Sequence, residues 1–431
     1  MSDFKTVRGM RDFLPQDARM MRYVEAKARR VAELYGYKEI ITPVVEPYEL
    51  LSAKAGDEVR SRMFIFKDLG GRDVALRPEF TASVARVVAS TFRNEPKPFR
   101  LFSVGTIYRY DEPQKGRYRE FWQSNYELMG SVRPEADAEI LLLTNSLMKT
   151  AGLGKFAFKV GHVGILKATM DEEKLEEKVQ NSVMQLMDKK QYDDAFLLLK
   201  EAGATKKCID ALQGLVELRG SDVFEVVGQV EKQVKSYAKS AKAATNLRDV
   251  LQLVSQSDVK IDLFVDAGFA RGLEYYTGMV FEVYIPDLDI ALGGGGRYDR
   301  LIELFGGEST PAVGVAHGLD RIMLGVQTQE RVSEQFEEKT VLVLAIKDEL
   351  KGEAFRIAET LRDAGVTVEL EVMGRKMAKA LEDADRRKFH FAVIVGEREL
   401  KEDSVVVRDL AKRQQKTVKI KDVVNLLRSR K

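Results

Sequence analysis

The sequence predicts an α+β fold with an antiparallel sheet, interrupted by a helical insertion and followed by a small α/β domain. Three observations lead to this prediction. Aromatic and polar residues alternate between residues 99 and 129, which is the period of half-buried antiparallel strands. Residues 165–257 instead carry apolar side chains at helical spacing in a background rich in Lys, Glu and Leu. After residue 339, strand and helix patterns alternate, as expected for a sheet with parallel pairs.

The segment before the alternating region predicts one helix and one strand. A stretch rich in Ala, Arg and Glu over residues 15–35 is typical of a helix, and the apolar run KEIITPVV predicts a strand closed by Pro43 and Pro47. This helix and strand are candidates for a dimer face. The alternating region then predicts a hairpin whose strands flank the charged connection DEPQKGRY.

The sheet is expected to resume after the insertion. The segments VKIDLFVD and FEVYI have residue patterns typical of strands. They lead into a predicted glycine-rich turn, ALGGGGRYD. A helix is expected from about His317 to Gln327. We therefore predict a first domain at residues 1–327 with the insertion at about 165–257, a linker at 328–338 and a second domain at 339–431.

Charge differs along the chain. The 431 residues include 69 basic and 67 acidic side chains, so the overall charge neither supports nor excludes nucleic-acid binding. Residues 339–431 carry 22 Lys and Arg against 16 Asp and Glu. This segment is the better candidate for a phosphate-facing surface, although a solvated charged surface explains the same excess.

Composition argues against several classes of site. A single cysteine cannot form a disulfide framework or a cysteine-based zinc site, and the three histidines lack the close spacing of helix-borne metal ligands, so no metal site is expected. No stretch approaches the roughly 20 apolar residues that span a bilayer, and the start MSDFKTVRGMRDF lacks a secretory signal. We expect a cytoplasmic protein that does not contact membranes.

Three segments combine residue types that carry chemistry. The first is Arg77-Pro78-Glu79-Phe80-Thr81, in which an acidic side chain follows a proline that fixes the local backbone. Taken alone, this segment is explained better by a helix start near Thr81.

The second segment, residues 108–123, concentrates cations in the predicted hairpin. These cations are Arg109, Lys115, Arg117 and Arg119. Such a density suits a triphosphate or the end of a polynucleotide, and an exposed charged hairpin is the alternative. Gln123 and Glu127 are four residues apart on the following strand, so both are expected on one face of the sheet.

The third segment, DAGFARGLEYYTGMVFE at residues 266–282, is a predicted turn between two strands. Burial in a core explains Tyr275 and Tyr276 but not Arg271. Two further pieces follow, GGGGRYD and GVAHGLDRI, whose glycines allow a backbone to approach a ligand closely. Arg321 on the expected helix adds a planar cation.

Together these pieces resemble class II aminoacyl-tRNA synthetases, and RGMRDFLP, LRPEFTAS, EPQKGRYREF, RGLEYYTG and GGRYDRL resemble the histidine-specific family. The resemblance covers essentially the whole chain. RGLEYYTG is similar to the family's histidine-recognition loop, while the hairpin and GVAHGLDRI match the general motifs two and three. The resemblance implies a class II catalytic domain with an antiparallel sheet of six or more strands, a helical insertion near the tRNA acceptor stem, a C-terminal anticodon-binding domain and a homodimer.

The resemblance also implies roles for individual residues. Arg109 matches the motif-two arginine at the α-phosphate, and Arg321 the motif-three arginine at the γ-phosphate. The implied ATP-binding residues are Arg109, Asp111, Arg117 and Arg321. The implied histidine-binding residues are Glu79, Phe80, Thr81, Arg109, Gln123, Glu127, Arg271, Tyr275 and Tyr276. Arg271 and Arg109 are the implied catalytic residues, and Gln114 and Arg119 would contact the tRNA acceptor end.

The implied reaction is the ATP-dependent ligation of L-histidine to its tRNA through a histidyl-adenylate. The substrate carboxylate is already a nucleophile at neutral pH, so positioning and charge stabilisation must supply most of the catalysis. Mg²⁺ carried by ATP would bridge the outer phosphates. Glu127 is expected to accept a hydrogen bond from the imidazole, and Glu79 to pair with the ammonium.

Two positions depart from the family pattern, and one has no implied role. Asp111 stands where motif two has glutamate, which leaves the reading of the adenine edge open, and Glu274 stands where many of these enzymes have aspartate. His317 is expected to pack in the core. The rival hypotheses are a non-catalytic regulatory paralogue in the ATP phosphoribosyltransferase complex and a stand-alone RNA-binding protein. Neither explains both the C-terminal domain and the retained arginines.

Overall fold

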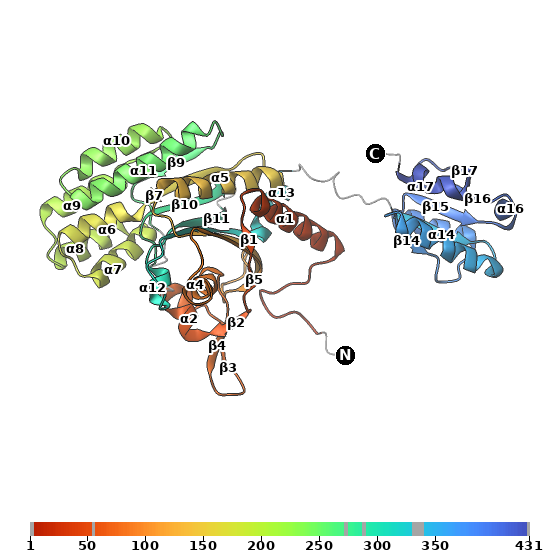
Figure 1. The fold of residues 1–431 in the computed structure, drawn as a ribbon, viewed down its shortest axis with the longest axis horizontal. Helices are drawn as coiled ribbons and strands as arrows, with labels where there is room; N and C mark the ends of the chain where they lie inside the picture. Colours follow the sequence, from red (N-terminus) through yellow and green to blue (C-terminus); the bar gives the residue numbers. More distant parts are fainter. Residues whose placement is uncertain (1–3, 54–56, 271–274, 287–289, 330–339, 429–431) are drawn as a thin grey trace. The chain divides into compact units, whose positions relative to one another are not determined.

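Three sheets organise the described part of the chain, one of nine strands, one of five and one of three (Figure 1). The computed structural model describes residues 4–53, 57–270, 275–286, 290–329 and 340–428. Contacts divide the chain into two units, Met1–Ser333 and Glu334–Lys431. None of the described helices is both long and apolar enough to cross a membrane.

A nine-stranded sheet forms the centre of the first unit, in the order β1-β5-β6-β12-β11-β10-β7-β9-β8. Its strands are β1 (Lys38–Glu39), β5 (Phe99–Tyr108), β6 (Glu120–Met129), β7 (Ala157–His162), β8 (Arg219–Gly220), β9 (Leu263–Asp266), β10 (Met279–Ile285), β11 (Ile290–Arg297) and β12 (Ala312–Gly318). The pairs β1–β5 and β7–β9 are parallel, and the other described pairs are antiparallel. The antiparallel fold class and the predicted β5–β6 hairpin are confirmed.

Alternation along β6 gives this sheet two different faces. The hydroxyl of Tyr126 donates to Ala28 O at 2.9 Å, on the face covered by α1 (Pro15–Leu34), α5 (Pro134–Ala151) and α13 (Leu319–Thr328). Glu127 points to the opposite face, where Thr81 at the start of α4 (Thr81–Ser90) contacts it. One face is thus closed by long helices, and the other is available for a site.

A small three-stranded sheet, β2-β4-β3, lies near α4 (Figure 1). Its elements and the short helices beside it are β2 (Val45–Pro47), β3 (Ile65–Lys67), β4 (Asp73–Leu76), α2 (Tyr48–Ser52), α3 (Asp57–Arg60) and α12 (Leu301–Leu304). The prediction of one strand over KEIITPVV was wrong, because Lys38–Glu39 joins the large sheet and Val45–Pro47 joins the small one. Pro43 lies between them, where its fixed φ and missing N–H interrupt strand pairing.

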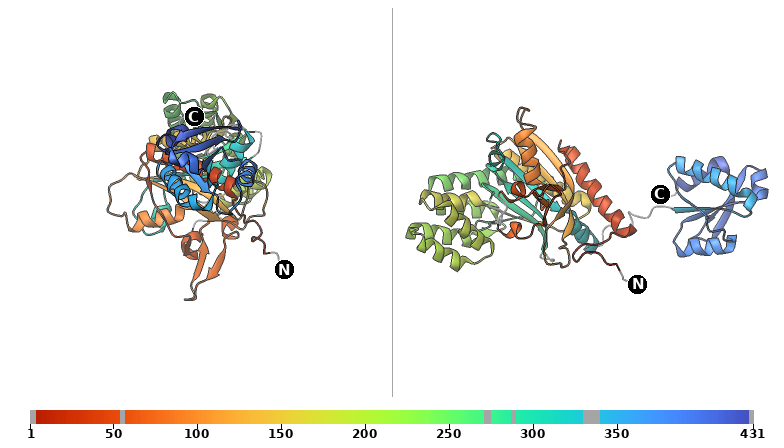
Figure 2. Two further views of the ribbon diagram at one scale, coloured as in Figure 1. Left: turned by 90° about the vertical axis from the view of Figure 1, so that its right-hand side faces the viewer. Right: turned by 90° about the horizontal axis from the view of Figure 1, so that it is seen from below.

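Between β7 and β9 the chain is almost entirely helical. The helices are α6 (Val163–Glu172), α7 (Glu177–Asp188), α8 (Tyr192–Glu201), α9 (Lys206–Glu217), α10 (Val223–Val234) and α11 (Ala238–Gln256). They stack at one end of the large sheet (Figure 2, right). Their buried side chains recur at helical spacing, as with Val226, Val230 and Val234 in α10. The strands on either side of this region, β7 and β9, pair directly.

The helix expected from about His317 begins two residues later than predicted. β12 continues through His317 to Gly318, and α13 starts at Leu319. His317 pairs in register with Ser124 of β6 and with Gly293 of β11. It is therefore part of the sheet, and the helix begins after it. Periodicity alone places such a boundary with an error of a few residues.

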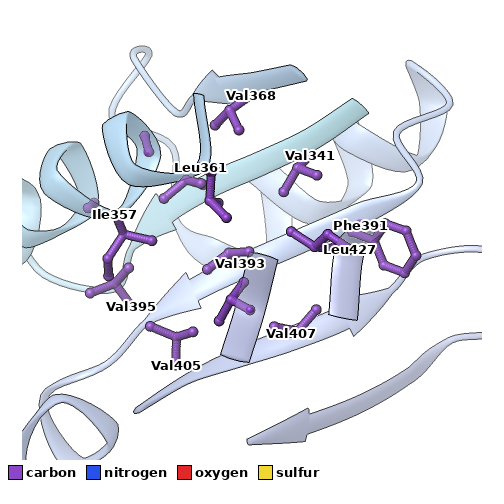
Figure 3. Close-up of a cluster of buried hydrophobic side chains, with 14 residues drawn as sticks. Val341, Ile357, Leu361, Val368, Phe391, Val393, Val395, Val405, Val407 and Leu427 are labelled. Carbon is purple, nitrogen blue, oxygen red and sulfur yellow. The ribbon is translucent and has the colours of Figure 1, made fainter. Parts of the chain in front are cut away.

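The second unit is a five-stranded sheet in the order β14-β13-β15-β16-β17. Its strands are β13 (Thr340–Ala345), β14 (Thr367–Leu370), β15 (Phe391–Val395), β16 (Ser404–Asp409) and β17 (Gln414–Lys419), and its helices are α14 (Lys351–Asp363), α15 (Met377–Arg386), α16 (Glu397–Lys401) and α17 (Ile420–Arg428). β13 is parallel to both of its neighbours, which confirms the predicted α/β class. Val341 and Val343 share a core cluster with side chains of α14 and α17, and Leu342 and Leu344 pack towards α15. Figure 3 shows Val341 of the first cluster beside Leu361 and Leu427.

Candidate active site

A cavity of about 280 Å³ opens on the face of the large sheet that is not covered by α1 and α5. Residues of β6, β11 and β12 line it, together with the β5–β6 connection and the start of α13. The lining residues that the sequence singled out are Glu79, Thr81, Arg109, Asp111, Arg117, Gln123, Tyr275, Tyr276 and Arg321. Folding therefore brings all three chemistry-bearing segments to one pocket.

The guanidinium groups of Arg109, Arg117 and Arg321 form a cluster in this cavity. Arg321 is anchored by its Nε, which donates to Gly116 O at 3.0 Å, and by Nη1, which donates to Ala291 O at 2.8 Å. Burial, followed by the like charges of Arg117 and Arg109, lowers the pKa of Arg321. Because cations held this close repel one another, the cluster favours a polyanionic ligand such as a triphosphate.

Arg109 is oriented by the loop that precedes α4. Its Nε donates to Pro78 O at 2.9 Å, and within the described part of the chain no acceptor binds its terminal nitrogens. The proline that carries the accepting carbonyl immediately precedes Glu79. The first and second chemistry-bearing segments are thus tied together by this bond, which leaves a bidentate face of the guanidinium for a ligand.

Asp111 is held between two arginines. Arg62 Nη1 donates to Asp111 Oδ1 at 3.0 Å, and Arg117 Nε lies 3.9 Å from Oδ2. The carboxylate is nearly buried and lines the cavity, as does Arg62, which the sequence did not single out. The pair gives Asp111 a fixed orientation at the edge of the cationic region.

Two hydrogen-bond acceptors lie in the same cavity as the cations. Tyr275 donates its hydroxyl to Glu79 Oε2 at 3.1 Å, and burial raises the pKa of Glu79 while the charge of Arg109 opposes that rise. Gln123 is 6% exposed, and its Oε1 has no partner among the described residues. A buried acceptor without a donor costs free energy, so a ligand that brings N–H donors is expected here.

Glu127 lies directly behind the cavity wall. The carboxylate is 1% exposed and accepts hydrogen bonds from Thr81 Oγ1 at 2.7 Å, from Asn125 Nδ2 at 2.6 Å and from the hydroxyl of Tyr298. Burial raises the pKa of Glu127 to about 7 in spite of these donors. The residues that donate to it line the cavity, whereas Glu127 itself does not, so its contact with an imidazole stays a prediction.

Asn125 and Tyr298 are pocket residues that the sequence analysis missed. Asn125 lies between Gln123 and Glu127 on the same strand, and residues at this spacing share a face of the sheet. The alternation used for Gln123 and Glu127 therefore already contained the signal. Tyr298 belongs to the quoted piece GGRYDRL, but no local pattern indicates that its hydroxyl reaches Glu127.

Phe80 is buried and is not among the residues that line the cavity. Its ring packs against the guanidinium of Arg77 at 4.3 Å, and it directly precedes α4. These contacts explain Phe80 by packing, so its role in histidine binding stays a prediction. Arg271 and Glu274 lie outside the described residues.

The two residues expected at the tRNA acceptor end have different environments. Gln114 is exposed at the turn of the hairpin, where its backbone pairs with that of Arg117. Arg119 is 5% exposed, stacks on Tyr110 at 3.6 Å and donates to Asp111 O at 3.2 Å. These contacts give Arg119 a structural role, and Gln114 is the residue of the two that a large ligand can reach.

The glycine run GGGG was predicted as a turn, and that prediction was wrong. These glycines lie within β11, between β10 and β12. A Cβ on Gly293 would come within 2.7 Å of Ala316 O, and a Cβ on Gly314 of β12 would overlap the carboxylate of Glu127. Glycine is required because neighbouring backbone and the Glu127 side chain occupy the space that a Cβ would need, not because the chain turns.

The start of α13 is fixed by Asp320, the residue before Arg321. Its carboxylate pairs with Arg11 and accepts from Trp122 N at 2.6 Å. The guanidinium of Arg11 also lies 3.6 Å from the centre of the Tyr118 ring. The N-terminal segment, the hairpin and α13 are thereby tied together next to Arg321.

His317 packs inside the first unit, as its lack of an implied role suggested. It is fully buried, its Nε2 lies 3.1 Å from Thr144 Oγ1, and its ring makes an edge contact with Tyr126. Burial lowers the pKa of His317 to about 3, so the imidazole is neutral at physiological pH. It lies on the closed face of the sheet, away from the cavity.

Comparisons with known proteins agree with this geometry. The family model described as histidyl-tRNA synthetase matches residues 9–322, and the one described as anticodon binding domain matches residues 340–430. A curated relative from Methanocaldococcus jannaschii is 42% identical over 98% of this chain and 99% of its own length. One from Pyrococcus furiosus is 39% identical over 98% of both chains. Both are named histidine–tRNA ligase.

Solved structures share the fold. The histidyl-tRNA synthetase from a Nostoc species superposes with a TM-score of 0.82 over the full length of both chains, at 23% identity. A Bacillus halodurans protein titled ATP phosphoribosyltransferase regulatory subunit/histidyl-tRNA synthetase has a TM-score of 0.76 and 26% identity, over 89% of this chain and 97% of its own. With both its sequence profile and its full-length relatives in agreement, this chain belongs to the histidyl-tRNA synthetase family.

Proposed function

We propose that this protein ligates L-histidine to its tRNA, using ATP to form a histidyl-adenylate in the cavity on the large sheet. One observation carries the proposal. Acceptors suited to an ammonium, Glu79 and Gln123 Oε1, share a single cavity with a cluster of guanidinium groups suited to a triphosphate. An amino-acid site beside a triphosphate site is the arrangement that adenylate formation requires.

In the proposed first step, a carboxylate oxygen of histidine attacks the α-phosphorus of ATP, and the bond to the pyrophosphate leaving group breaks. Arg109 and Arg271 stabilise the charge that develops at the α-phosphate, while Arg321 and Arg117 hold the outer phosphates. Mg²⁺ enters with ATP as part of the substrate and screens the same charges. In the second step, a ribose hydroxyl of the tRNA attacks the activated carbonyl, and AMP leaves.

Histidine is proposed to bind with its ammonium between Glu79 and Gln123. Tyr275 and Tyr276 supply ring surfaces beside these acceptors, and Tyr275 also holds Glu79 in place. Glu127 accepts a hydrogen bond from the imidazole, directly or through Thr81 or Tyr298, whose hydroxyls touch both the carboxylate and the cavity. A buried polar site of this kind rejects analogues that lack the matching donor.

The tRNA is proposed to contact both units. The second unit matches an anticodon-binding domain and carries the excess of basic side chains that suits phosphate contacts. In the first unit, exposed Gln114 on the hairpin is the proposed contact for the acceptor end. The proposed place of action is the cytoplasm, where tRNA is charged for translation.

A homodimer is the proposed assembly. Apolar side chains are exposed in the segment of β1 to β4, where Ile41 is 86%, Ile65 47% and Phe66 44% exposed. A second copy that covers this surface would bury them. Light scattering that gives twice the 48.6 kDa chain mass supports the dimer, and a monomer at enzyme concentrations excludes it.

The regulatory alternative is not favoured. Curated relatives over the full length of the chain are named histidine–tRNA ligase, and the chain retains an anticodon-binding domain and the cationic cluster of the cavity. A regulatory subunit has no need of three arginines that repel one another in the absence of a triphosphate.

The test of the proposed function is the acylation of tRNA with labelled histidine. The unmodified protein should form histidyl-tRNA, and Arg321→Ala should slow the reaction by roughly 10², as expected when one fixed electrostatic donor is lost. Arg30→Ala is the matched control, because Arg30 is an exposed cation on α1 that pairs with Glu33 on the same helix. No acylation by the folded, unmodified protein would contradict the proposal.

A further inference from the structure

We propose that Lys167 and Gly164, on the first helix of the insertion, are positioning residues for the histidine side of the cavity. The inference rests on the proposed function and adds a coupling between the helical insertion and the binding of histidine. Through these residues, the helical insertion sets the placement of Tyr275 and Tyr276, and hence the affinity for histidine.

The start of α6 faces three consecutive peptide groups of the segment that follows the two tyrosines. Lys167 Nζ donates to Tyr276 O at 3.3 Å, and Val163 N donates to Gly278 O at 3.0 Å. Both donors lie in the first half of α6, and Val163 N is one of the backbone N–H groups at the helix start that have no acceptor within the helix. Two bonds, one from a charged group, therefore hold the backbone of residues 276–278 against the insertion.

The third contact is a close approach that only glycine permits. A Cβ on Gly164 would lie 2.9 Å from Thr277 O and 2.8 Å from Cε1 of His162, which is shorter than real side chains allow. His162 is itself buried between sheet and insertion, with its Nε2 3.3 Å from Oδ1 of Asn246 on α11. The segment therefore lies directly against the start of α6, and α11 supports His162 behind this contact.

The opposite side of the segment is fixed to the sheet. Thr277 N donates to Arg297 O at 2.8 Å, and the side chain of Arg297 is locked by a buried ion pair with Asp137 at 2.5 Å. One side of the segment is therefore anchored rigidly, while the other depends on α6. A shift of α6 would move the backbone that carries Tyr275 and Tyr276, both of which line the cavity.

This arrangement predicts an effect on histidine that does not extend to ATP. Tyr275 reaches Glu79 and the amino-acid end of the cavity, whereas Arg321 is anchored by Gly116 on the hairpin and Ala291 on β11, both outside the insertion. Loss of the Lys167 bond should therefore weaken histidine binding and leave the triphosphate contacts in place.

The test compares Lys167→Met, Lys167→Arg and Gly164→Ala with a control, Lys178→Met, in ATP–pyrophosphate exchange. Lys178 is an exposed lysine on α7, so its replacement makes the same change of charge in the same insertion. Lys167→Met should raise the KM for histidine roughly tenfold, the low end for losing a hydrogen bond from a charged group, with the KM for ATP changed less than about twofold. Lys167→Arg should recover part of the loss because it keeps a cationic donor, and Gly164→Ala should raise the same KM.

A melting curve of each variant establishes that it is folded, and the decision rests on Lys167→Met because its side chain is only partly buried. A parental KM for histidine in this variant, or equal increases in the KM for histidine and for ATP, overturns the positioning role. If the unmodified protein activates a different amino acid, the proposed function fails, and the same variants then test the positioning against that amino acid.

Discussion

Glu127 carries a carboxylate at a place where the surrounding protein disfavours charge. Burial raises its pKa to about 7, although Thr81, Asn125 and Tyr298 all direct hydrogen-bond donors at it. A well-packed apolar side chain would fill this position at lower cost, since desolvating a carboxylate is expensive. The retained carboxylate is best explained by a contact with the substrate, which is the basis of the next two predictions.

Replacing Glu127 by alanine should raise the KM for histidine strongly and change the KM for ATP little. The imidazole would lose a charged acceptor whose hydrogen bond contributes ~1.5–3 kcal/mol. Steady-state exchange kinetics at varied histidine and at varied ATP measure the two constants separately. Equal effects on both substrates would count against a contact with the imidazole.

Glu127 should also make the stability of the first unit depend on pH. Its folded pKa of about 7 lies above the ordinary value of 4.5, so the folded state binds the proton more tightly, and stability should fall as pH rises from about 4.5 through 7. The full effect is on the order of 3 kcal/mol. Glu127→Gln removes it, so the Tm of the parental protein should fall relative to that of the variant between pH 5 and pH 8.

The difference in Tm between the parental protein and Glu127→Gln separates the effect of Glu127 from the effect of the buried histidines. Burial lowers the pKa of His162 to about 4 and that of His317 to about 3, so both contribute stability that is present above their unfolded value of 6.5 and lost as pH falls below it. They act alike in both proteins and cancel in the comparison. A pH-independent difference in Tm would show that Glu127 titrates as an ordinary exposed carboxyl.

Sequence patterns predicted which residues share a face of the sheet but not how deeply each is buried. The four-residue spacing placed Gln123 and Glu127 on one side of β6, as observed. The same reasoning could not tell that Arg119 is buried against Tyr110, because that contact joins side chains whose positions depend on the tertiary fold of the hairpin. Thr81 was interpreted both as a helix start and as a binding residue, and it is the first residue of α4 and also lines the cavity.

At the scale of elements, β11 and β12 show how a strand can be built from glycine. Glycine weakens strands and is typical of turns, so local composition indicated a turn where a strand was found. In β11 the deciding constraint is the backbone of the neighbouring strand, since a Cβ on Gly293 or Gly295 would meet a carbonyl oxygen of β12, and in β12 it is the Glu127 carboxylate that lies against Gly314. These constraints are set by strands distant in the sequence, which explains why no local pattern could predict them.

Gly314→Ala should therefore damage both stability and histidine binding. The added Cβ would overlap the Glu127 carboxylate and come within 2.9 Å of Tyr126 O, so the carboxylate or β12 must move. We expect a loss of ~1–3 kcal/mol in stability together with a raised KM for histidine.

Gly352→Ala is the control, because nothing lies within 4 Å of a Cβ at that position in α14. Alanine there should be neutral or stabilising by ~0.5–1 kcal/mol, since glycine is a poor helix former. Melting curves and exchange kinetics check both variants. A Gly314→Ala protein with parental stability and parental KM would refute the role assigned to this close approach.

At the scale of the whole molecule, the two units are expected to divide the work on the tRNA. A protein ending at Ser333, where the first unit ends, should still activate histidine but charge tRNA severely less well. The anticodon-binding unit is absent from this variant, whereas all the residues that line the cavity lie within residues 59–321. Circular dichroism establishes the fold, and unchanged charging efficiency in a folded truncated protein would contradict the division of labour.

The fold class was predictable from the sequence because the spacing of apolar residues in strands and helices is a local property. The order of the strands could not be predicted in this way. Alternation and helical spacing indicated an antiparallel sheet, a helical region and a second α/β unit. The pairing of β7 with β9 across the helices of residues 163–256, and the small sheet that takes Val45–Pro47, depend on contacts between distant segments. Such contacts leave no periodic signal in either partner.

The central claim is that the cavity activates histidine with ATP, and ATP–pyrophosphate exchange with each of the twenty amino acids tests it most directly. The assay requires no tRNA, so it isolates the cavity of the first unit from the second unit. Exchange should depend on histidine, with the other amino acids near background, because Glu79, Gln123 and the buried Glu127 cluster match an ammonium and an imidazole together. Exchange that depends on a different amino acid, or no exchange by the folded protein with any of the twenty, would contradict the account.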